Sequence, residues 1–185
     1  TISGLRKRGY PSKSIRDFCH HIGIAKTNST HEIELLESFV RRELNQSSQR
    51  RMAVVDPVRL TITNWQAGKI EHRTAINNPE DTDAGTREVP FSGHLLIERE
   101  DFMEDPPSKF FRLSPGREIR LRYGYFVTCT GVVKDESGTV VEILCTYDPE
   151  TSGGKAPDGR KVKATIHWVE ETSCLRGSVA MYDRL

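Results

Sequence analysis

Basic and aromatic residues are interleaved in one short stretch of the sequence, residues 109–125. Aromatic rings stack on unpaired bases, and guanidinium groups pair with phosphates or with the edges of bases. The stretch therefore favours a surface for single-stranded nucleic acid, with a solvated outer face of a sheet as the alternative. Its basic and aromatic residues are Lys109, Phe110, Phe111, Arg112, Arg117, Arg120, Arg122, Tyr123 and Tyr125.

The segment "REIRLRYGYF" within this stretch alternates between polar and apolar residues. Glu118, Arg120 and Arg122 have one parity, whereas Ile119, Leu121 and Tyr123 have the other. Alternate side chains of a strand point to opposite faces. The pattern predicts a strand with one apolar face and two guanidinium groups about 7 Å apart on the other.

The elements that must position these residues change in type along the chain. Apolar residues recur at helical spacing over 11–23 and 29–46, with Gly23 as a stop signal and Ser29 or Thr30 as the expected N-cap of the second helix. From Met52 onward the period becomes two. We expect strands over residues 58–65, 94–101, 117–127, 139–147, 160–169 and 178–185.

Strands that follow one another without intervening helices predict an antiparallel barrel or sandwich. We therefore predict an α+β fold in which a small helical unit over residues 1–50 precedes an antiparallel β-barrel over residues 51–185. The chain of 185 residues is long enough for a substantial core, and its first residue is Thr1 rather than Met, which favours a fragment of a longer protein.

Several classes of function lack their usual signatures. No apolar run is long enough to cross a membrane, and no glycine-rich loop has the spacing of a phosphate-binding motif. Cys19, Cys129, Cys145 and Cys174 have no zinc-site spacing and are expected to be free thiols, and the histidines form no cluster with metal-ligand spacing. The sequence predicts no catalytic residue and no metal ligand in this chain.

Charge is unevenly distributed although the formal net charge is only +1. Residues 1–52 contain ten Lys and Arg against five Asp and Glu, and residues 109–122 contain five against one. Residues 53–108 have the opposite bias, five against eleven. The two basic segments are the candidate contacts for a polyanion.

Specific strings along the whole chain resemble glutaminyl-tRNA synthetase, in the part that follows its class I catalytic core. The strings include "LRKRGYPSKSIRDFCHHIG", "MAVVDPVRLTITNW", "FFRLSPGREIRLRYGYF", "CTYDPET" and "GRKVKATIHWV". The resemblance implies a helical connecting subdomain followed by the proximal anticodon-binding barrel, which is of a ribosomal-protein-like type. Glutamyl-tRNA synthetases of the eukaryotic and archaeal type share this architecture and remain an alternative.

The family attaches glutamine to tRNA-Gln using ATP and Mg²⁺, with both catalytic signatures in the core. The resemblance implies that this chain reads tRNA, has no cofactor of its own and is inactive alone, and that glutamine and ATP bind elsewhere in a monomeric, cytoplasmic parent enzyme. Two further classes stay open, namely a non-catalytic RNA-binding or interaction barrel and an enzyme with an unrecognised site.

The resemblance also implies which residues contact the anticodon stem-loop. The family's anticodon arginines fall on Arg112, Arg120 and Arg122, and a further one falls on Arg50 or Arg51. Asn45 occupies another contact position. One departure is Phe111, where the family often has Lys; a contact there would be stacking or packing instead of a charge.

Overall fold

The structure, a computed structural model, describes residues 1–182. These residues form two compact units. One unit contains Thr1–Arg50 and Ile76–Gly85, with the described residues from Ala180 onward, and the other contains Arg51–Ala75 and Thr86–Val179. The end of the predicted 51–185 domain, residues 183–185, lies outside the described residues.

The first unit contains three helices, α1 (Ile2–Lys7), α2 (Ser12–Ile22) and α3 (Ile33–Ser47). Phe18 of α2 meets Phe39 of α3 edge to face, with ring centroids 6.1 Å apart. Gly23 ends α2 with a φ of 68°, the left-handed region that glycine adopts without strain. The N-cap predicted at Ser29 or Thr30 is wrong, because α3 starts later and Glu32 is its N-cap residue.

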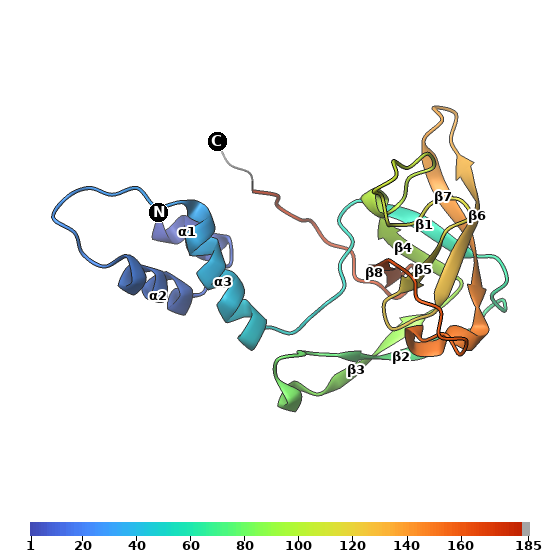
Figure 1. The fold of residues 1–185 in the computed structure, drawn as a ribbon, viewed down its shortest axis with the longest axis horizontal. Helices are drawn as coiled ribbons and strands as arrows, with labels where there is room; N and C mark the ends of the chain where they lie inside the picture. Colours follow the sequence, from blue (N-terminus) through green and yellow to red (C-terminus); the bar gives the residue numbers. More distant parts are fainter. Residues whose placement is uncertain (183–185) are drawn as a thin grey trace. The chain divides into compact units, whose positions relative to one another are not determined.

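The second unit is built on one curled sheet (Figure 1). Its strands lie in the order β8-β5-β6-β7-β1-β4-β9, and all pairs are antiparallel except β1–β7 and β5–β8. The predicted α+β class is thus confirmed, as a helical part and a mostly antiparallel half-barrel. The strands are β1 (Pro57–Ile62), β4 (His94–Glu98), β5 (Glu118–Leu121), β6 (Phe126–Lys134), β7 (Val140–Asp148), β8 (Thr165–Ile166) and β9 (Val169–Glu170).

The core lies on the concave side of this sheet and is formed by the apolar parity of each strand. Ile119 and Leu121 of β5 are fully buried in it, as the alternation predicts. Trp168, between β8 and β9, is also fully buried and donates a hydrogen bond from Nε1 to the carbonyl of Arg122 at 2.9 Å. The buried indole therefore holds the residue that follows β5.

Two strands that sequence reasoning missed, β2 (Glu71–Ile76) and β3 (Thr86–Phe91), form a separate two-stranded sheet. The polar segment 77–85 connects them. Of the residues in β2, only Ala75 is buried, so this ribbon carries little of the apolar alternation that identifies a strand.

The two predicted strands nearest the C-terminus are wrong in extent. The strand expected over 160–169 is reduced to β8 and β9, because the chain leaves the sheet at His167 and Trp168 to bury the indole. The strand expected over 178–185 is not formed in residues 178–182, whose side chains are exposed, and its remainder lies outside the described residues. Within residues 1–182, no helix has the length and apolar character to cross a membrane.

Candidate nucleic-acid interface

The strand predicted over 117–127 is wrong in extent, because the structure divides it into β5, which ends at Leu121, and β6, which begins at Phe126. β5 stops at Leu121, and Arg122 and Tyr123 form a tight turn closed by the Gly124 amide, which donates to the Leu121 carbonyl at 2.8 Å. Tyr123 has a φ of 65°, which explains why the alternation fails there. Arg122 still follows the register of β5, because its amide donates to the carbonyl of Ile166 in β8 at 2.9 Å.

Arg120 lies on the outer face of β5 and has no anionic partner among the described residues. Its guanidinium carbon is 5.5 Å from the centre of the Phe126 ring, and the aliphatic part of its side chain lies against Gly154. The Nε atom is buried without a hydrogen-bond partner. Across residues 1–182, no hydrogen bond or ion pair engages the guanidinium group. The two terminal guanidinium nitrogens of Arg120, though not the buried Nε, are therefore available to a ligand.

Arg122 is the second outward-facing arginine of this edge. It is exposed, and its guanidinium carbon lies 5.2 Å from the centre of the Tyr123 ring. Within the described part of the chain, its side chain forms no ion pair. Two cations thus stand on neighbouring outward positions, and each lies beside an aromatic ring, that of Phe126 buried and that of Tyr123 partly exposed. Cations beside an accessible ring can bind single-stranded nucleic acid, and Tyr123 supplies such a ring here.

Arg112 lines an open groove of about 530 Å³. Its Nη1 donates to Oδ1 of Asp101 at 2.6 Å, and its side chain stays 47% exposed whereas that of Asp101 is 8% exposed. Burial raises the pKa of Asp101, and the charge of Arg112 opposes that shift. Asp101 therefore fixes the guanidinium in one orientation and leaves part of it open to the groove.

Phe111 forms part of the same groove. Its ring is 46% exposed, and the ammonium group of Lys163 lies 5.0 Å from the ring centre. An exposed phenyl ring beside two cations can stack a base while the cations meet phosphate. Sequence reasoning identified Arg112 and Phe111 but missed Lys163, which is distant in sequence and reaches the groove through β8.

The structure separates Arg50 from Arg51. Arg50 donates to the backbone carbonyls of Leu44, Asn45 and Ser48 at 3.3, 3.0 and 3.1 Å, and to the side-chain oxygen of Asn45 at 3.1 Å. These carbonyls belong to the end of α3 and the residue after it, where backbone acceptors lack helical partners. Arg50 is thus a helix C-terminal capping residue, and Arg51 is exposed.

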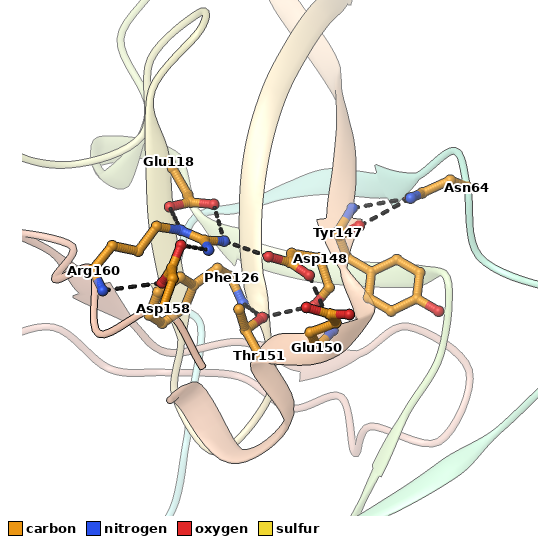
Figure 2. Close-up of polar contacts among 9 residues, drawn as sticks. All are labelled: Asn64, Glu118, Phe126, Tyr147, Asp148, Glu150, Thr151, Asp158 and Arg160. Carbon is orange, nitrogen blue, oxygen red and sulfur yellow. Dashed lines mark hydrogen bonds and ion pairs between the residues drawn. The ribbon is translucent and has the colours of Figure 1, made fainter. Parts of the chain in front are cut away.

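A further arginine, Arg160, is not among the candidate contact residues that the sequence indicates. It joins three carboxylates at the outer face of β5, β6 and β7 (Figure 2). Nε and Nη2 donate to Glu118 at 3.0 and 3.1 Å, Nη1 donates to Asp158 at 2.7 Å, and Nη2 also pairs with Asp148. Hydrogen bonds from Arg160 lower the pKa of Asp148. No sequence pattern signals this cluster.

Other chemistries find less support. All four cysteines are free thiols. Among residues 1–182, no three His, Cys, Asp or Glu side chains gather in a way that could hold a metal ion. The candidate site is therefore the set of outward arginines and aromatic rings on β5, its turn and the adjoining groove.

These residues belong to a mostly antiparallel half-barrel. The family model for the anticodon-binding domain of class I tRNA synthetases for glutamate and glutamine (E and Q) matches residues 48–148. The chain belongs to this family.

The relatives that the chain matches include glutamine–tRNA ligases from three bacteria. That of Rhodopirellula baltica is 58% identical over the whole chain, which covers 31% of the relative. The ligase of Bradyrhizobium diazoefficiens is 54% identical, and the chain covers 33% of it. The ligase of Clostridium perfringens is 52% identical, and the chain covers 34% of it. The chain therefore spans about a third of the length of the curated relatives it matches.

Proposed function

We propose that this chain binds the anticodon stem-loop of tRNA-Gln as part of a glutamine–tRNA ligase. The observation that carries the proposal is the unpaired guanidinium group of Arg120, which stands beside Phe126 on the outer face of a domain of the anticodon-binding family. An arginine that folding leaves without an anionic partner is suited to phosphates and base edges, because its planar fork matches both.

Arg112, Arg120 and Arg122 are the proposed contacts to the anticodon nucleotides. Arg51 is the proposed fourth arginine, since Arg50 is occupied at the end of α3. Asn45 accepts from Arg50, and its amide nitrogen is the group proposed to face the stem-loop. Bidentate contacts from Arg to a base edge discriminate among bases, whereas contacts to phosphate only position the chain.

The ligase reaction belongs to the longer protein that this proposal implies. There, ATP and glutamine are bound outside the present chain, and Mg²⁺ is the expected metal of the ATP site. We propose that the parent enzyme is a cytoplasmic monomer and that the present chain alone neither forms glutaminyl-adenylate nor charges tRNA. Pyrophosphate exchange with glutamine and ATP by this chain would contradict that part of the proposal.

Binding of the chain to anticodon stem-loops, with each anticodon base varied, tests the proposal. The double variant Arg120→Ala, Arg122→Ala is expected to weaken binding by about 1–3 kcal/mol for each base-reading contact and to relax discrimination at the bases concerned. Arg59→Ala is the matched control, because Arg59 is also outward-facing but already paired with Glu171. Unchanged affinity and base preference in the double variant would refute the assignment.

A further inference from the structure

The outer face around Arg120 contains carboxylates that could capture its guanidinium group. In the sheet register, Arg120 of β5 pairs with Phe126 of β6, and Phe126 pairs with Asp148 of β7. Directly paired residues point to the same face, so Asp148 shares the outer face with Arg120. Glu118 lies two positions before Arg120 on β5, hence on that face as well.

Arg160 occupies these carboxylates. Its fork engages Glu118 through two hydrogen bonds, and the same Nη2 atom pairs with Asp148 on the far side of β6. The guanidinium carbon of Arg160 lies 5.5 Å from the centre of the Phe126 ring, the same distance as that of Arg120. Two guanidinium groups therefore flank one ring, but only one of them is paired with carboxylates.

The guanidinium groups of Arg160 and Arg120 differ in whether their N–H donors are hydrogen-bonded. Every nitrogen of the Arg160 guanidinium donates to a carboxylate, whereas no described residue accepts a hydrogen bond from the Arg120 guanidinium. A guanidinium group held by three carboxylates has little left to offer a phosphate, whereas the unpaired group of Arg120 keeps the donors of its two terminal nitrogens. Arg160 therefore neutralises the carboxylates of this face, and the guanidinium group of Arg120 has no carboxylate partner.

We propose that Arg160 is a positioning residue for RNA recognition, which keeps Glu118 and Asp148 away from Arg120 and lowers the negative charge that an approaching phosphate meets. This inference rests on the proposed function, because it assumes that Arg120 contacts RNA. Without Arg160, Glu118 and Asp148 become unneutralised carboxylates on the same outer face as Arg120. They would then compete with the RNA for that guanidinium group.

The charge-removing variant Arg160→Met tests the proposal in stem-loop binding by the full chain. It is expected to weaken binding about tenfold, which is the loss of roughly one good arginine contact. The triple variant Arg160→Met, Glu118→Gln, Asp148→Asn is expected to restore affinity to within about threefold, because both competing carboxylates are gone. The substitution Asp148→Asn keeps an oxygen acceptor for the Glu150 amide, so the turn after β7 keeps its cap.

Recovery of stem-loop affinity in the triple variant distinguishes the possible roles of Arg160. If Arg160→Met binds as tightly as the parent chain, or if the triple variant does not recover, the proposal is wrong and Arg160 is either irrelevant or an RNA contact itself. If Arg160→Met alone does not fold, the triple variant is measured in its place. The proposal is supported if the triple variant binds with near-parental affinity and if adding Arg120→Ala to it abolishes that binding. Weak binding by the triple variant overturns the proposal. Absence of binding by the parent chain would instead contradict the proposed function.

Discussion

Gly154 lies directly against the side chain of Arg120, so that a Cβ atom at position 154 would stand 2.7 Å from Cδ of the arginine. The contact comes from the short 3-10 segment η3 (Pro149–Gly154), which follows β7 and covers Phe126. Thr151 in this segment accepts a hydrogen bond from the Phe126 amide at 2.8 Å. The sequence after β7 therefore shapes the surface on which Arg120 rests.

Gly154→Ala is expected to weaken RNA binding by displacing Arg120. Its φ of 76° disfavours a side chain, which costs about 1 kcal/mol of stability by itself. The matched control is Gly153→Ala, since Gly153 has a φ of 70° but a Cβ added to it would meet no atom within 4 Å. Both variants should lose similar stability in thermal unfolding, whereas only Gly154→Ala should lose stem-loop affinity. Equal affinities for the two variants would contradict the supporting role of Gly154.

The neighbouring residues Arg50 and Arg51 are expected to have separable effects. Arg50→Ala removes four hydrogen bonds at the end of α3 and should destabilise the helical unit by about 1–3 kcal/mol. Arg51→Ala should leave stability within about 0.5 kcal/mol and weaken stem-loop binding. Chemical denaturation and binding titrations on both variants check the pair. A loss of binding at constant stability in Arg50→Ala would reverse the two roles.

The alternation in β5 shows what periodicity can predict. Ile119 and Leu121 are buried and Arg120 faces outward because a strand has only two faces, so local pattern and tertiary position agree. The turn at Tyr123 does not follow from this pattern, since the positive φ arises from closing β5 onto β6.

The Arg160 cluster shows where sequence reasoning stops. Its partners Glu118 and Asp148 are 42 and 12 residues away in sequence, and they meet only because β5, β6 and β7 are neighbours. Nothing in the local sequence around Arg160 distinguishes it from an exposed loop arginine. Likewise, the adjacent Arg50 and Arg51 are equivalent by sequence and become different only when α3 ends beside one of them.

The ionisation of Glu170 is expected to make the free energy of unfolding depend on pH. Burial raises its pKa, but hydrogen bonds from Ser173, Thr172 and Ser92 outweigh that effect and lower the pKa to about 2. A folded-state pKa below that of the unfolded chain stabilises the fold at higher pH, and this stabilisation is lost as the pH falls from about 5 toward 2. The contribution is on the order of 3 kcal/mol above that range.

Glu170→Gln should remove most of this dependence, so that its unfolding free energy falls less steeply between pH 5 and about 2 than that of the parent chain. Urea denaturation at several pH values measures the slopes. Glu150→Gln is the control, because Glu150 is exposed. If the parent chain and Glu170→Gln lose stability in parallel on acidification, the Glu170 network is not responsible.

Phe111 is expected to contribute stacking, and a lysine at its position should contribute charge instead. Phe111→Leu keeps an apolar side chain but removes the ring, so it should weaken stem-loop binding by about 1–3 kcal/mol with an unchanged salt dependence.

Phe111→Lys should recover affinity at low salt and steepen the dependence of log K on log salt by about 0.7, the value for one added phosphate contact on a single strand. Binding titrations at several salt concentrations compare these chains. If Phe111→Leu binds as well as the parent at every salt concentration, the exposed ring packs within the groove and does not meet a base.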